Sequence, residues 1–239
     1  MNTAPPMQAS LQLISSMATK GLLTDLVTRY QALTGTAVRV TSIGGVDAAR
    51  RVAAGEAFDA VVLACNAIDA LIASGHVRAG SRVDVADSGV AVAVRQGAEV
   101  PDIGSEAALK AAVLAAPRLA YSTGPSGVAL AQLFERWGIA AELAPRIVTA
   151  PPGVPVGTLV ARGEVDLGFQ QLSELMHLDG ITLVGPLPAA VQITTTFSAG
   201  IASTSTRADA VRALLAFFAA PEQAALKQQH GMSAPALET

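Results

Sequence analysis

The chain has 239 residues, of which 51% are hydrophobic and only 15% carry a charged side chain. The charged share lies well below the roughly 25% of an average globular protein, which excludes a disordered chain and a charge-rich coiled coil. The net charge of −3 gives no general attraction to nucleic acid or to anionic lipid. No apolar run reaches the roughly 18 residues that a membrane helix needs, so we expect no membrane insertion.

Metal and disulfide chemistry find little support in the sequence. Cys65 is the only cysteine, which excludes an intrachain disulfide and a site with several thiolate ligands. His76, His177 and His230 lie far apart without metal-ligand spacing. We therefore expect neither a metal nor another cofactor.

The N-terminal segment bears on localisation. Residues 1–10 have neither the basic region nor the apolar core of a secretion signal. Two localisations stay open: the periplasm, if a signal peptide has been removed, and the cytoplasm otherwise.

Three successive strand–loop–helix units are predicted in the first third of the chain. The strands cover 11–14, 38–41 and 58–64. The third strand is nearly all apolar, which is typical of a strand buried on both faces of a parallel sheet. This order indicates the α/β class, in which ligands bind outside the carboxyl ends of the strands.

A second set of such units follows, with strands at 89–95, 119–121 and 165–169. A strand over 191–197 and a helix over 208–219 close the chain. We therefore predict two α/β lobes, 1–87 plus 195–239 and 88–194, each a mostly parallel sheet flanked by helices. A ligand cleft is expected between the lobes, in a monomer.

Several loops at predicted strand ends carry groups that suit an anion. The first precedes a helix and offers hydroxyls and one ammonium, from Ser15, Ser16, Thr19 and Lys20. Helix N-termini present unpaired N–H groups and favour negative charge, although plain helix capping explains such residues as well. The two neighbouring loops add Ser42, Gly44 and Asn66.

In the second lobe, the segment 121–127 opens a helix with two glycines and several hydroxyls. It lacks the lysine of a P-loop and the G-x-S-x-G spacing of a nucleophile elbow, so it is either a tight turn or an anion-binding turn. Its candidate residues are Thr123, Ser126, Gly127 and Val128.

Four further side chains are candidates for ligand contact or proton transfer. Gln170 and Gln171 follow an apolar strand, where two amides have no packing rationale and can orient a ligand. Arg50 can reach a carboxylate or can be a solvated surface arginine. Glu174 and His177 are three residues apart, which suits an acid/base pair if the stretch is helical, or an ordinary surface pair.

The chain resembles the substrate-binding proteins of ABC importers, and within them the molybdate-binding branch. The resemblance rests on the strand–SSMATK–helix opening, on AGEAFDAVVLA (54–64), on GTLVARGEVDLGFQQLSE (157–174) and on ALLAFFAAPE (213–222). It implies a two-lobed type II periplasmic-binding fold and an importer permease as partner. It also implies that serines in the first two loops and a tyrosine after the late second-lobe strand hold an oxyanion.

At those positions this chain departs from the pattern. Ala18 and Gly45 or Val46 stand where the serines are expected, and Gln171 where the tyrosine is expected. Because a buried oxyanion needs its donors supplied, these losses argue against molybdate. Lys20, Arg50 and the paired glutamines favour a flatter and larger anion, such as an organic polycarboxylate.

The segments GFQQLSEL (168–175) and VGPLPAAVQ (184–192) resemble the aconitate isomerases, which are built on the same fold. This resemblance implies a 1,3 proton shift in an unsaturated tricarboxylic acid, with Lys20, Glu174 or His177 as the base. We expect a solute-binding protein for a small anion. The alternatives are such an isomerase, a molybdate or other oxyanion binder, and a cytoplasmic ligand sensor that acts through a partner.

Overall fold

The structure is a computed structural model that describes residues 10–151 and 153–235. Most of the N-terminal segment used for the localisation prediction, and Pro152 of the predicted connector turn, lie outside these residues. The chain divides into two compact units. Unit 1 contains the described residues up to Ala86 together with Phe197–Lys227. Unit 2 contains Asp87–Thr196 and the described residues after Lys227.

The segment after Lys227 corrects the predicted division, which placed it in the first lobe. There, β9 (Met232–Ser233) pairs antiparallel with Asp87 and Ser88. A Cβ at Gly231 would lie 2.9 Å from atoms of Leu172 and Met176. This pairing and close packing attach the segment to unit 2.

Unit 1 is an α/β layer structure. Its strands lie in the order β2 (Val38–Ile43), β1 (Leu11–Ser16), β3 (Ala60–Ala64) and β8 (Thr194–Ile201). The first three are parallel, and β8 is antiparallel to β3. β8 and β4 (Val83–Arg95) both continue into unit 2.

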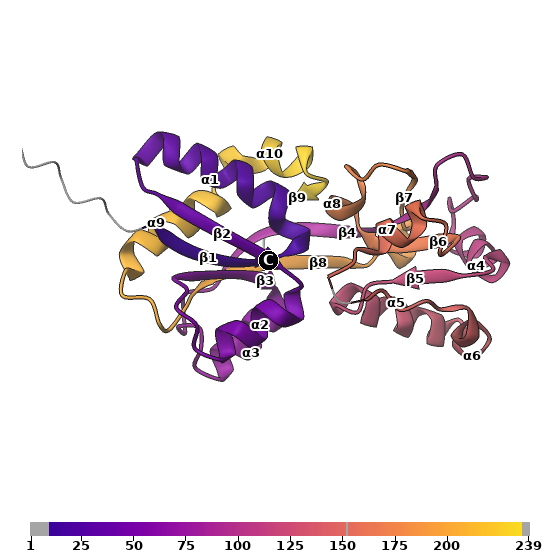
Figure 1. Cartoon of the computed structure of the whole chain (residues 1–239), viewed down its shortest axis with the longest axis horizontal. Helices are drawn as coiled ribbons and strands as arrows, with labels where there is room; N and C mark the ends of the chain where they lie inside the picture. The colour runs from indigo at the N-terminus through magenta and orange to yellow at the C-terminus, as the bar shows by residue number, and fades with distance from the viewer. Residues whose placement is uncertain (1–9, 152, 236–239) are drawn as a thin grey trace, which may run out of the picture. The chain divides into compact units, whose positions relative to one another are not determined.

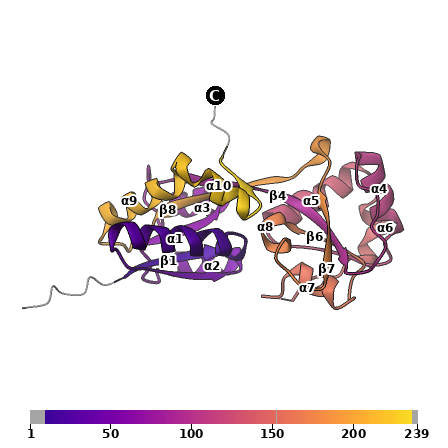
Figure 2. The same cartoon turned by 90° about the horizontal axis from the view of Figure 1, so that it is seen from above.

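The helices of unit 1 cover both faces of this sheet. Figure 1 shows α1 (Lys20–Thr34) and α9 (Ala208–Ala219) on one face, with α2 (Gly45–Ala53) and α3 (Cys65–Ala73) on the other. Figure 2 places α9 beside α1, where Tyr30 and Phe217 hold their ring centroids 5.3 Å apart. Two short segments, η1 (Met17–Thr19) and η4 (Pro221–Gln223), complete the unit, and α10 (Ala224–Gln229) crosses its boundary at Lys227.

Unit 2 contains a mixed sheet rather than a mostly parallel one. β6 (Leu167–Gln171) runs parallel to β5 (Leu119–Tyr121). β4 runs antiparallel to both β6 and β7 (Ile181–Pro186). Its helical segments are α4 (Glu106–Ala115), α5 (Pro125–Arg136), α6 (Ala140–Leu143), η2 (Ala144–Arg146), α7 (Val156–Ala161), α8 (Leu172–Leu175) and η3 (Ala189–Val191).

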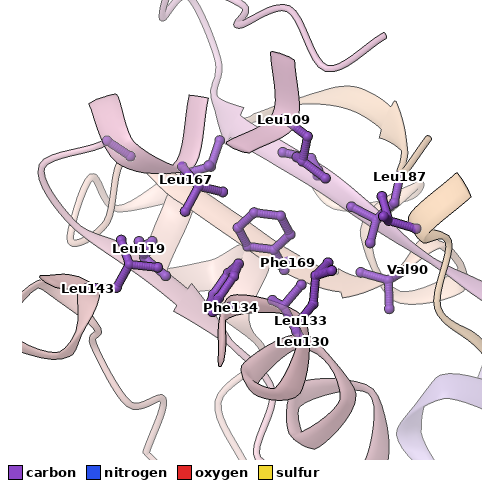
Figure 3. Close-up of a cluster of buried hydrophobic side chains, with 14 of the residues drawn as sticks. Val90, Leu109, Leu119, Leu130, Leu133, Phe134, Leu143, Leu167, Phe169 and Leu187 are labelled. Carbon is purple, nitrogen blue, oxygen red and sulfur yellow. The ribbon is translucent and has the colours of Figure 1, made fainter. Parts of the chain in front are cut away.

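The largest core of unit 2 lies on the α5 face of its sheet. Phe169 stands in the middle of this cluster, which includes Val90, Leu130 and Phe134 (Figure 3). The rings of Phe134 and Phe169 meet edge to face with centroids 6.2 Å apart, a favoured arrangement of aromatic pairs. The opposite face packs smaller residues, since Ala91 and Ala93 contact Leu175.

Local signals in the sequence place several helix ends correctly. Gly35 follows α1 with φ of 72°, a left-handed conformation that glycine adopts without strain. Ser105 precedes α4, and its side chain accepts a hydrogen bond from the Ala108 N–H, as expected of an N-cap.

Replacing the central aromatic residue of unit 2 tests this packing. Phe169→Ala is expected to lower the free energy of unfolding by about 3–5 kcal/mol, because a fully buried ring leaves a cavity. Leu183→Ala, at a side chain that is 38% exposed, serves as the control. Urea unfolding followed by circular dichroism measures both. A loss for Phe169→Ala no larger than for the control contradicts this core.

Candidate functional site

In unit 1, three helices begin at one edge of the sheet. The parallel strands β1, β2 and β3 end at that edge and lead into η1–α1, α2 and α3. The N-cap residues of these helices are Thr19, Gly44 and Ala64, and none makes a side-chain capping hydrogen bond. The Lys20 N–H donates to the Met17 carbonyl and the Ala67 N–H to the Asn66 side chain, so only some of the first-turn N–H groups remain open. The helix dipoles favour an anion at this edge.

The hydroxyls predicted for the first loop lie at this edge but are bonded among themselves. Ser15 and Ser42 are register partners, and their hydroxyl oxygens are 2.8 Å apart. Thr19 donates its hydroxyl to the Ser16 carbonyl oxygen at 3.1 Å. Ser15, Ser16 and Thr19 are all buried. The sequence placed Ser15 and Ser16 in a loop, whereas they are the last two residues of β1.

The other candidates of unit 1 are exposed. Lys20 is the first residue of α1, and the described residues form no ion pair with it. Arg50 pairs with Asp47 at 2.5 Å on the surface of α2, with its side chain 76% exposed. Asn66 uses its side-chain oxygen to accept from the Ala67 N–H. Arg50 therefore takes the surface alternative that the sequence left open.

In unit 2, the segment 122–127 forms the entrance to α5. The helix begins at Pro125, so Ser126 and Gly127 lie buried in its first turn rather than in a loop. Ser126 and Ser122 hydroxyls hydrogen-bond at 3.0 Å. A Cβ at Gly127 would lie 1.5 Å from the Ser122 carbonyl oxygen, so this position requires glycine. Thr123 and Val128 are exposed.

The paired glutamines are the last residues of β6 and both are buried. Gln170 accepts from the Gly157 N–H at 3.0 Å and donates to the Glu174 carboxylate at 2.8 Å. Gln171 donates to the Thr195 hydroxyl at 2.9 Å. The two amides therefore have structural partners that the sequence did not reveal.

Glu174 is the most perturbed acid of unit 2. Burial raises the pKa of its carboxyl to about 7, although the hydrogen bond from Gln170 lowers it. Such a group exchanges a proton near neutral pH, which suits a general base.

His177 does not pair with Glu174. The helix α8 ends at Leu175, so the two residues do not share a helical face as the spacing suggested. The His177 side chain is exposed, and its ring centroid lies 6.3 Å from that of His230. The partner of Glu174 is Gln170 instead.

Two residues of this region were missed by sequence reasoning. Gly157 provides the N–H that orients Gln170, and a backbone group leaves no signal in the sequence. Thr195 provides the acceptor for Gln171. Its only signal is a polar residue within the apolar alternation of the strand at 191–197.

Residues 10–151 and 153–235 contain neither a metal-binding cluster nor a membrane-spanning helix. No group of three or more His, Cys, Asp or Glu side chains there is arranged to hold a metal ion. None of the helices in those ranges is long and apolar enough to span a membrane.

Comparison with known proteins identifies the family. Residues 11–233 match the model of bacterial extracellular solute-binding proteins. The chain is also 38% identical over 229 residues to the aconitate isomerase of a Pseudomonas species, which covers 93% of this chain and 87% of that protein. The chain belongs to the bacterial extracellular solute-binding protein family.

Solved structures show the same fold. The periplasmic molybdate-binding protein of Azotobacter vinelandii superimposes with a TM-score of 0.78 at 21% identity, covering 95% of this chain and 100% of that one. The sulfate-binding protein of Mycobacterium tuberculosis gives 0.76 at 16% identity, covering 94% and 86%. The predicted α/β class and type II periplasmic-binding fold are confirmed, while the ligand cleft between lobes stays a prediction.

Replacing Glu174 tests its burial through stability. Folding raises the pKa of this carboxyl from 4.5 to about 7 and so favours the protonated form. The resulting stability is complete below about pH 4.5 and is lost as the pH rises through 7. Glu174→Gln stays neutral, so its stability relative to wild type is expected to increase by up to about 3 kcal/mol between pH 4.5 and 8.

Denaturant unfolding at several pH values measures this difference. Glu164→Gln, at an exposed carboxylate, is the control. A difference for Glu174→Gln that does not change with pH shows that the carboxyl is solvated.

Proposed function

We propose that this protein binds a small polycarboxylate and interconverts the cis and trans isomers of aconitate. The feature that carries the proposal is the Glu174 carboxyl, whose pKa burial raises to about 7 and which accepts a hydrogen bond from Gln170. The 38% identity to an aconitate isomerase supports it independently.

The reaction needs only a proton carrier and donors for an anion. Glu174 as carboxylate removes a proton from the methylene carbon of aconitate, and the electron pair delocalises over the allylic carbons and their carboxylates. The protonated Glu174 then returns the proton to the carbon that was vinylic, which moves the double bond. Atoms and charge balance without an oxidant, a reductant or a further reactant.

Each unit, taken by itself, carries groups that suit a carboxylate. Unit 1 offers the N-terminus of α2, where the N-cap is Gly44, with Lys20 as a cation. Unit 2 offers the α5 N-terminus, where the N-cap Gly124 makes no side-chain hydrogen bond. N–H donors that are oriented before binding also stabilise the delocalised anion in the transition state.

Turnover of trans-aconitate tests this proposal directly. The wild type is expected to form cis-aconitate with a kcat/KM that rises with pH through about 7, as Glu174 loses its proton. Glu174→Gln is expected to lower kcat by about 10²–10⁴-fold with unchanged affinity for the substrate. Liquid chromatography of the two isomers measures the rate, with Glu164→Gln as the control.

No turnover by the wild type at micromolar concentration rejects the isomerase. Full activity of Glu174→Gln rejects Glu174 as the base and leaves Lys20 and His177 as the remaining candidates.

A second function is solute capture without chemistry. The family match over residues 11–233 favours it, since its members are extracellular solute-binding proteins. In this case the protein delivers an anion to an importer permease from outside the cytoplasmic membrane. A ligand that raises the melting temperature but is recovered unchanged supports this function over the isomerase.

Lys20 provides a test of binding that both functions share. Lys20→Ala is expected to weaken polycarboxylate binding by about 3–10-fold, because an exposed charge contributes modestly. Titration calorimetry with citrate measures the affinity, and Lys110→Ala in unit 2 is the control. Equal affinity in both variants removes Lys20 from the site.

A further inference from the structure

Among the described residues of unit 2, three buried side-chain atoms make no hydrogen bond, and two of these lie on neighbouring strands of the sheet. These two are the hydroxyl oxygen of Ser88, on β4, and the side-chain oxygen of Gln171, at the end of β6. Ser88 is 1% exposed and Gln171 is 4% exposed. An unpaired buried polar atom costs free energy, so a ligand group that pairs with it gains affinity there.

The strand register places both residues on one face of the sheet. Gln171 lies opposite Val90 in the β4–β6 pair, and opposite residues of antiparallel strands point to the same side. Ser88 stands two residues before Val90, so it shares the face of Val90. Ser88 and Gln171 are therefore neighbours on the same face.

Thr195 joins them from β8. The Val90 N–H donates to the Ile193 carbonyl, and the Thr196 hydroxyl donates to Asp87 at 2.6 Å. These two contacts set an antiparallel register in which Ser88 lies opposite Thr195. The hydrogen bond from Gln171 to Thr195 confirms that the side chains meet on this face.

The same face carries the entrance of α5. Val90 and Phe169 pack there against Leu130 of α5 (Figure 3). Tyr121 lies beside Phe169 in the parallel pair of β5 and β6, so α5 starts at the end of the sheet where Gln171 closes β6. The Ser88 hydroxyl can donate to an anionic guest, and the dipole of α5 favours negative charge at this end of the sheet.

We propose that Ser88, Gln171 and Thr195 form a binding subsite for one carboxylate of the ligand. This inference rests on the proposed polycarboxylate function and adds two residues of unit 2, Ser88 on β4 and Thr195 on β8. Ser88 donates its hydroxyl to a carboxylate oxygen. When the Gln171 side-chain amide flips, the Thr195 hydroxyl donates to its oxygen. The amide nitrogen then becomes the second donor to the carboxylate.

Single-hydroxyl deletions test the subsite with a saturated tricarboxylate, propane-1,2,3-tricarboxylate, which cannot undergo the proton shift. Ser88→Ala and Thr195→Val are each expected to raise its Kd by about 10–100-fold in titration calorimetry, as for a hydrogen bond to a charged group. The melting temperature of the free protein is expected to change little, because Ser88→Ala removes an unpaired group.

Ser173→Ala is the matched control, since the Ser173 hydroxyl is also buried without a partner but lies on α8. If the wild type binds the tricarboxylate and Ser88→Ala binds it equally well, the subsite alone is overturned. The unpaired atoms then bind a water molecule instead. A wild type that binds no tricarboxylate overturns the proposed function as well. Equal loss in Ser173→Ala also overturns the subsite.

Discussion

The alternation of side chains along β6 is the constraint on which unit 2 depends. Its five residues, Leu167–Gln171, are all buried, so each side chain must find a partner on its own face of the sheet. Phe169 fills the α5 face and fixes the register, which sends Gln170 to the opposite face. A register slip by one residue would turn each glutamine to the opposite face of the sheet and break every hydrogen bond that the two side chains make.

This constraint separates two chemical roles by one residue. Gln170 links the Gly157 N–H to Glu174 and so orients the carboxyl whose pKa is raised by burial. Gln171 faces Thr195 and keeps an unused oxygen. One amide thus serves a candidate proton carrier, and the next serves a candidate binding group.

Both units keep features that cost stability. In unit 1, three helices begin without side-chain caps, although a capping side chain is worth about 1 kcal/mol. In unit 2, Ser88 and Gln171 bury atoms without partners. Features of this kind persist where a ligand supplies the missing partners, which agrees with membership in a solute-binding family. The chain keeps the type II fold although Ala18 and Gln171 depart from the molybdate pattern.

Much of the fold was accessible from the sequence because it depends on local patterns. Apolar strands such as 60–64 and helix ends such as Gly35 carry period and backbone signals that need no knowledge of the rest of the chain. β4 starts at Val83, earlier than predicted. The sequence did not reveal this start because Asp84 and Asp87 interrupt the apolar run. Their hydrogen-bond partners, Ser198 and Thr196, lie over a hundred residues away.

The candidate site was only partly accessible, for the same reason. Lys20 and Glu174 were identified by residue type, but the burial that raises the pKa of Glu174 arises from packing of distant segments. Arg50 looked equally suitable and pairs with Asp47 on the surface. Predicting the opposite orientations of Gln170 and Gln171 requires the correct end of the strand, which the sequence placed two residues too early.

The protonation of Glu174 is the property that most directly decides whether this fold performs chemistry. Carbon-13 NMR of protein labelled at glutamate side chains, assigned with Glu174→Gln, gives the pKa of this carboxyl from its chemical shift against pH. A midpoint near 7 is expected. A midpoint near the ordinary glutamate value of about 4.3 would show a solvated carboxylate and contradict this expectation.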